Sequence, residues 1–292
     1  MIDQFVIGFK PQRWWGSLAA VDFFLGGTGA GAFVLSMSLN TLPGMIVGWV
    51  AVALGAVALL ADLGKPGRFV RAGSQAGRSW ISRGAIFTSI FLLFGILRIA
   101  AQVAPGLPWA PGGALGQAVG LLATLGALGV MVYTGFLLSQ SPSIPFWNTT
   151  MLPLLFASFA FTCGVGVVLV MLPILGEKVI DLRTVELLSM ALVAASLVLL
   201  WAYMLSMSSS TVAAKESVRM LTSGPLASLF WLGVNVVGLI VPLVAIALVY
   251  VSNAASGSTL ALALAGILVL VGGYISRYCV LKAGVYPPVI DL

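Results

Sequence analysis

Long runs of apolar residues, separated by short polar stretches, extend along the whole chain. A helix needs about 20 consecutive apolar residues to cross a bilayer, and eight runs reach that length. They lie approximately at residues 16–40, 43–62, 83–104, 115–138, 150–174, 185–208, 226–252 and 259–281. Because the runs are continuous and do not alternate with polar positions, they exclude an outer-membrane barrel. The pattern predicts an all-α polytopic membrane protein with eight transmembrane helices. It leaves open whether these form two four-helix bundles, over residues 1–145 and 146–292.

The composition agrees with this fold class. Hydrophobic residues make up 60% of the chain and charged residues only 8%, whereas a soluble domain carries about 25% charged residues. The first 15 residues contain Asp3, Lys10 and Arg13 without a short apolar core, so we expect no cleavable signal peptide. The net charge of +6 is interpreted as a topology and docking signal, because no aromatic-basic pattern typical of nucleic-acid binding accompanies it.

The residue types that bind metals are scarce. The chain has no histidine, so it cannot provide the two axial His ligands of a bis-His membrane haem. Its two cysteines, Cys163 and Cys279, lie in separate apolar runs, and an Fe–S cluster usually needs four. They are interpreted as packing residues. We therefore expect no haem, no Fe–S cluster, no metal site and no covalently bound cofactor in this chain.

A basic loop, residues 62–83, joins the second and third apolar runs. Its charged residues are Asp62, Lys65, Arg68, Arg71, Arg78 and Arg83. The simpler explanation is that positive loops flank membrane helices and set their topology. The Gly-Lys-Pro-Gly turn and the tryptophan at position 80 favour a defined surface instead. The residues predicted to dock a partner protein are Lys65, Arg68, Arg71, Arg78 and Trp80.

An even number of spans places both ends of the chain on one side, here called the terminal face. The opposite face receives only Arg98, Lys178 and Arg183, so the other eleven of the 14 Lys and Arg residues belong to the terminal face. The positive-inside rule then places both termini in the cytoplasm. A basic face built to dock an acidic partner would produce the same bias.

Helix direction brings four polar residues to one membrane level near the terminal face. Asp22 and Arg83 lie early in the first and third runs, and Asp62 and Tyr133 lie late in the second and fourth. An intramembrane carboxylate is costly and is a functional candidate by default, although a shallow or paired Asp22 and an interfacial Tyr133 are simpler explanations. A quinone headgroup needs hydrogen bonds at two carbonyls and a proton route. It suits this arrangement, as other small ligands would.

Two further features have alternative explanations. Gly27 and Gly31 are spaced i, i+4, which permits close helix packing or leaves room for a flat ligand. The acidic residues Glu177, Asp181 and Glu186 lie on the opposite face, where a proton path through the second half could open. Glu186 is the proton-transfer candidate there, and Asp22 and Asp62 are the candidates near the terminal face.

Four stretches then become recognisable. Residues 23–33 read FFLGGTGAGAF, residues 62–69 read DLGKPGRF, residues 79–85 read SWISRGA, and Tyr133-Thr-Gly is followed by IPFWN at 144–148. In this order the motifs resemble the NrfD/PsrC family, of the polysulfide reductase membrane-anchor type. The RYCVLKAG stretch at 277–284 resembles the family more weakly.

The resemblance implies a haem-free subunit of a respiratory complex in a prokaryotic cytoplasmic (inner) membrane. Such a subunit exchanges electrons between menaquinone or ubiquinone and a docked ferredoxin-like Fe–S subunit, which often joins a molybdenum or tungsten pterin catalytic subunit. By position in the motifs, Tyr133 is the first quinone-contact candidate, followed by Asp22 and Arg83, with Gly27 and Gly31 as pocket walls. A passive, quinone-independent anchor is one alternative. A secondary transporter is another, which would show inverted repeats, and no convincing pair of repeats is present.

Overall fold

The computed structural model describes residues 8–62, 79–175, 181–252 and 258–288, and it confirms the all-α membrane fold. Within these ranges, eight helices are long and apolar enough to cross a membrane. Seven of the spans are α1 (Ser17–Ser38), α2 (Leu42–Asp62), α4 (Trp80–Val103), α5 (Ala114–Ser139), α6 (Met151–Leu175), α7 (Leu182–Ser208) and α10 (Ser258–Lys282). The remaining span combines the π-helix η3 (Leu229–Ile240) with α9 (Val241–Ser252).

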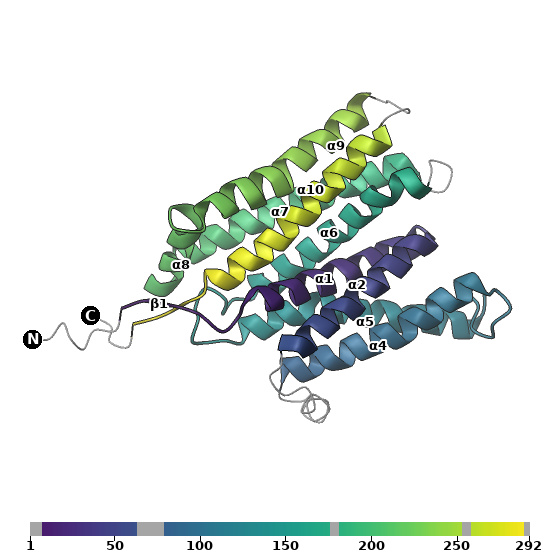
Figure 1. Ribbon diagram of the computed structural model, residues 1–292, viewed down its shortest axis with the longest axis horizontal. Coiled ribbons are helices and arrows are strands. Elements are labelled where there is room, and N and C mark those ends of the chain that lie inside the picture. Colours follow the sequence, from purple (N-terminus) through teal and green to yellow (C-terminus); the bar gives the residue numbers. More distant parts are fainter. Residues whose placement is uncertain (1–7, 63–78, 176–180, 253–257, 289–292) are drawn as a thin grey trace, which may run out of the picture.

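The helices run back and forth along one long axis, so that α1 begins and α10 ends at the same end of the molecule (Figure 1). Two short strands, β1 (Lys10–Pro11) and β2 (Val285–Tyr286), pair antiparallel at that end, with Lys10 opposite Tyr286. This end is the terminal face inferred from the sequence. Large apolar side chains such as Leu54, Leu93 and Leu248 remain more than half exposed on the outer surface, as lipid-facing positions of a membrane protein would be.

The α1 helix has neighbours on both sides, because it contacts α2 and α5 in the first half and α6 and α10 in the second. Gly29 on α1 and Gly48 on α2 allow the two backbones to approach closely, since a Cβ built on Gly29 would lie 2.5 Å from the Gly48 carbonyl oxygen. Small residues at such positions let membrane helices approach closely enough to gain van der Waals contact. The division into two four-helix bundles at residues 145 and 146 stays a prediction.

The seventh span contains a feature that hydropathy did not predict. Its first half is a π-helix, and the Asn235 side chain donates from Nδ2 to the Phe230 carbonyl five residues earlier at 2.9 Å. Trp201 on α7 donates from Nε1 to Asn235 Oδ1 at 3.1 Å. Asn235 is therefore satisfied by helix packing. This is a structural role for a polar residue inside a membrane span.

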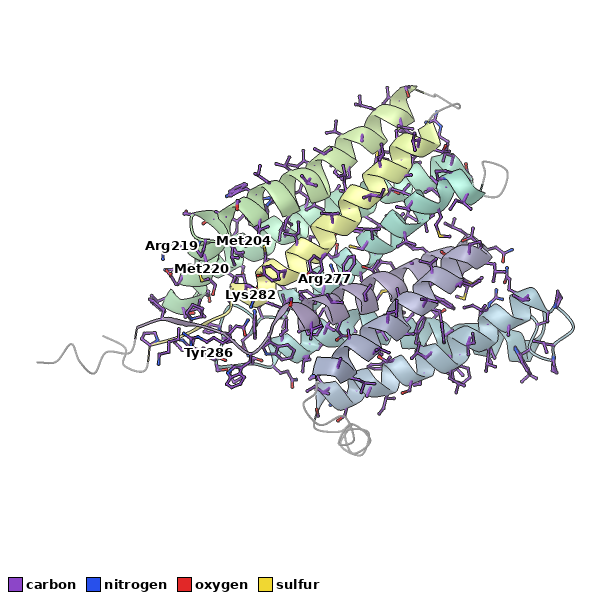
Figure 2. All side chains as sticks on the ribbon, viewed as in Figure 1. Met204, Arg219, Met220, Arg277, Lys282 and Tyr286 are labelled. Carbon is purple, nitrogen blue, oxygen red and sulfur yellow. The ribbon has the colours of Figure 1, made fainter. Side chains whose placement is uncertain are left out.

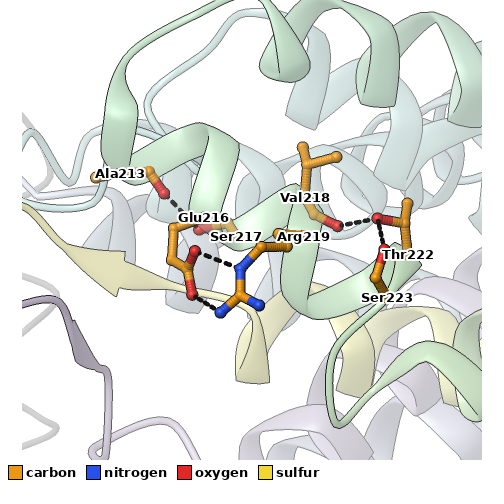
Figure 3. Close-up of polar contacts among 7 residues, drawn as sticks. All are labelled: Ala213, Glu216, Ser217, Val218, Arg219, Thr222 and Ser223. Carbon is orange, nitrogen blue, oxygen red and sulfur yellow. Dashed lines mark hydrogen bonds and ion pairs between the residues drawn. The ribbon is translucent and has the colours of Figure 1, made fainter.

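A short helix, α8 (Val212–Thr222), links the sixth and seventh spans at the terminal face (Figure 1). Thr211 caps its start by accepting from the Ala214 amide at 3.3 Å. On its outer side, Arg219 donates twice to Glu216, at 2.7 and 2.6 Å (Figure 3). This hydrogen-bonded pair lowers the pKa of the Glu216 carboxyl below its ordinary value. Because the pair is solvent-accessible, its contribution to stability is small.

Candidate functional site

A cavity of about 380 Å³ lies near the terminal face, between α1, α2, α4 and α5. Its wall consists of Trp15, Asp22, Phe23, Gly26, Val52, Ala56, Leu59, Leu60, Ile81, Gly84, Ala85, Thr88, Ser89, Leu92, Val130 and Tyr133. The size and the mostly apolar wall with a few polar groups are typical of small-molecule sites. Small residues, including Gly26, Ala56, Gly84 and Ala85, leave the space that larger side chains would fill.

Asp22 and Tyr133, which are 111 residues apart in the chain, meet at this cavity. The Tyr133 hydroxyl donates to Asp22 Oδ2 at 3.4 Å, a long hydrogen bond between two buried groups. Asp22 is 3% and Tyr133 6% exposed. The sequence prediction that α1 and α5 bring these two residues to one membrane level is therefore matched by their positions. The pair provides a donor and a carboxylate side by side on an apolar wall.

Gly84 on α4 fixes how closely the Tyr133 ring can lie to that helix. A Cβ built on Gly84 would lie 2.3 Å from Cδ2 and 2.5 Å from Cε2 of the Tyr133 ring. Only a glycine therefore allows the ring to lie this close to α4 with its hydroxyl directed to Asp22. The hydroxyl of Ser89, also on the wall, donates to the Ala85 carbonyl of its own helix at 2.8 Å.

Arg83 and Trp80 lie beside the cavity but not on its wall. The Arg83 guanidinium carbon is 4.5 Å from the centre of the Trp80 ring, and that ring stacks on Phe136 at 4.4 Å. Trp80 is thus enclosed between Arg83 and α5. The Trp80 ring is half-buried against Phe136, and its part in docking a partner stays a prediction. Arg83 is not among the residues that line the cavity, and its contact with a quinone stays a prediction.

Gly27 and Gly31 were predicted to form walls of the pocket. In the structure they instead lie where α1 packs against α6 and α10. A Cβ built on Gly31 would lie 2.2 Å from the Ala160 carbonyl oxygen of α6, and one on Gly27 would lie 3.1 Å from Arg277 Nη2. The simpler explanation, close helix packing, holds for both. Gly26, one residue earlier, is the α1 glycine that lines the cavity.

Arg277 is buried where α10 passes α1, rather than on the terminal face with the other basic residues (Figure 2). Its Nε donates to the Phe23 carbonyl at 3.2 Å and its Nη1 to the Gly273 carbonyl at 3.0 Å. The rings of Phe24, Phe156 and Phe159 each lie 5.9 Å from the guanidinium, which is within cation–π range. Burying a guanidinium is costly without such partners, and here it joins α10 to the backbone of α1.

Other predicted residues lie outside this site. The side chain of Asp62, and Lys65, Arg68, Arg71 and Arg78 of the basic loop, lie outside the described residues. Glu186 is buried near the start of α7, at the end of the molecule away from the cavity. The structure therefore brings Asp22 and Tyr133 together and leaves Glu186 separate from them.

Sequence reasoning missed several wall residues, above all Trp15. The Trp14-Trp15 pair reads as an interfacial anchor, yet Trp14 is 86% exposed while Trp15 lines the cavity. The glycine at position 84 and the hydroxyls of Thr88 and Ser89 were also missed. Their i, i+4 and i, i+5 spacing on α4 is a weak signal, because α4 is apolar around most of its surface.

Comparison with known proteins adds an independent line of argument. A model of the family described as "Polysulphide reductase, NrfD" matches residues 6–288. The C subunit of polysulfide reductase from Wolinella succinogenes is 38% identical over 165 residues, which cover 54% of this chain and 50% of that protein. The match thus spans about half the length of that relative.

Proposed function

This chain belongs to the NrfD, polysulphide reductase family of membrane proteins, and we propose that it is the quinone-reactive membrane subunit of a respiratory oxidoreductase. It would exchange electrons between menaquinone or ubiquinone and a docked ferredoxin-like Fe–S subunit. The single observation that carries the proposal is the buried Asp22–Tyr133 pair on the wall of an apolar cavity. A flat headgroup with two oxygens needs such a site.

The geometry suggests how the residues divide the work. The Tyr133 hydroxyl can donate a hydrogen bond to one oxygen of the headgroup, and the Asp22 carboxylate can take a proton from a quinol hydroxyl. Oxidation of one quinol releases two protons and two electrons. The protons would leave by way of Asp22, with Asp62 at the end of α2 as the next acceptor. The electrons would pass to the Fe–S cluster of the partner, and quinone reduction would reverse each step.

The family match supports a proposal for the partners. The relative's name denotes one lettered subunit of polysulfide reductase, and we propose a multi-subunit organisation here as well, with an Fe–S subunit and a molybdenum or tungsten pterin subunit. Lys65, Arg68, Arg71 and Arg78 of the basic loop would form the docking surface. From the charge bias we propose that this surface and both termini lie in the cytoplasm of a prokaryote, with the chain in the inner membrane.

The test is purification of the complex in mild detergent by a tag on this chain. Mass spectrometry identifies the co-purifying subunits, and solvent extraction measures bound quinone in the same preparation. We expect an Fe–S subunit together with quinone. An Fe–S subunit without quinone, even after quinone is added, would indicate a passive anchor. A lone chain with neither would favour the transporter.

A separate prediction concerns proton movement through the second half. If Glu186 takes part in a transmembrane proton path, Glu186→Gln should lower proton release per electron in reconstituted vesicles by at least about twofold, because the amide cannot accept a proton. The rate of electron transfer should stay within about twofold, because Glu186 lies away from the cavity. Proton release equal to that of the unaltered complex would remove Glu186 from the proposed path.

A further inference from the structure

Trp15 forms one wall of the cavity although it precedes the first residue of α1. A wall residue outside a helix needs its own means of support, since the helix hydrogen bonds do not hold it. Gly16 occupies the N-cap position of α1 and has no side chain, so it makes no side-chain capping hydrogen bond to the first turn of the helix. Other groups must therefore set the position of Trp15.

Gln12 provides that support. Its Oε1 accepts from the Trp15 amide at 2.8 Å, and its Nε2 donates to the Trp15 carbonyl at 3.0 Å. The same Nε2 donates to the Leu281 carbonyl at the end of α10, at 2.9 Å. One carboxamide thus binds both backbone groups of Trp15 and joins them to the last span. Gln12 is 4% exposed, and both of its donor hydrogens are used.

The ring of Trp15 is held from the side as well. It lies edge-on to the Trp147 ring at 6.4 Å and tilted against Phe23 at 5.7 Å. Trp147 in turn donates from Nε1 to the Val280 carbonyl at 2.8 Å. Gly284 leaves room for the Trp147 ring, since a Cβ built on Gly284 would lie 2.6 Å from Trp147 Cζ2. Both supports of Trp15 therefore end on residues 280–284.

We propose that Gln12 is a positioning residue that fixes Trp15 as the aromatic wall of the quinone cavity by tying it to the end of α10. This inference rests on the proposed function. The indole would pack against the headgroup or the first part of the isoprenoid tail, where aromatic contact adds to apolar burial. Residues near the two ends of the chain would thereby determine how tightly a site between α1, α2, α4 and α5 binds its substrate.

The test measures the dissociation constant of a short-chain naphthoquinone analogue for the purified complex. Gln12→Leu keeps the side-chain volume and removes all three hydrogen bonds, so we expect binding to weaken by about tenfold, with a larger effect on KM than on kcat. Trp15→Ala should weaken binding to a similar extent. The double variant should bind no more weakly than Trp15→Ala alone, because the two residues act through one contact. Trp14→Ala is the matched control and should stay within about twofold.

Three results would overturn the inference. They are an unchanged dissociation constant in Gln12→Leu, single-variant losses that multiply in the double variant, and an equal loss in Trp14→Ala. If Gln12→Leu fails to assemble, Gly284→Ala crowds both supports of Trp15, because its Cβ would lie 2.6 Å from Trp147 Cζ2 and 3.1 Å from Gln12 Cγ. This variant should give the same weakening, while unchanged binding would count against the inference. If the unaltered complex binds no naphthoquinone, the proposed function itself is refuted. If the unaltered complex binds it and Gln12→Leu binds it equally well, only the role of Gln12 is refuted.

Discussion

Replacing Asp22 by Asn should lower quinone-linked electron transfer of the complex by about 100-fold, the usual scale for loss of a positioned proton acceptor. The amide preserves the size of the side chain and can still accept a hydrogen bond from Tyr133, but it cannot take a proton from a quinol. Tyr133→Phe should cost less, about tenfold, because it removes one hydrogen-bond donor, which serves Asp22 in this structure and the headgroup when quinone is bound. Both variants should assemble normally, since each keeps the volume of a buried side chain.

The measurement is quinol oxidation by the purified complex, alongside electron transfer from a chemical donor that bypasses the quinone. The bypass rate should not change. Two matched controls are available: Glu216→Gln, an acid on α8 away from the cavity, and Tyr203→Phe, a buried tyrosine whose hydroxyl donates to the Phe146 carbonyl at 2.5 Å. Quinone-linked activity in Asp22→Asn close to that of the unaltered complex would refute the assigned role and favour a passive anchor.

Gly31→Val should prevent most of the protein from folding or assembling. The first added carbon would lie 2.2 Å from the Ala160 carbonyl oxygen, and it would also approach Gly164 Cα at 3.4 Å. The obstacle is backbone, so no side-chain rotation can relieve it, and α1 must move away from α6. Overpacking typically costs about 1–3 kcal/mol, and we expect at least the upper end because the two halves of the molecule meet here.

Thermal unfolding in detergent and the yield of intact complex measure this effect. Gly31→Ala should give an intermediate loss, since Ala adds only the first carbon. Gly106→Val is the control, because a Cβ at Gly106 meets nothing within 4 Å, and its melting temperature should match that of the unaltered protein. A Gly31→Val protein with an unchanged melting temperature would show that the close approach of α1 and α6 is wrong.

Much of the fold was determined by local properties of the sequence. In lipid every backbone polar group must be satisfied within its own segment, so a run of about 20 apolar residues becomes a helix wherever it occurs. The eight spans were therefore predictable to within a few residues. Their alternating direction placed Asp22 and Tyr133 at one level, because that depends only on the count of spans and the position of a residue within its run.

The direction in which each side chain faces was decided only by the tertiary structure. These helices are apolar around most of their circumference, facing lipid on one side and protein on the other, so periodicity does not distinguish the two. Adjacent residues of an α-helix point about 100° apart, and Gly26 consequently lines the cavity while Gly27 packs against the second half. In the same way, the sequence could not separate Trp14 from Trp15. Nor could it place Arg277 beside the Phe23 carbonyl, 254 residues away, because contacts between distant helices depend on how the whole set packs.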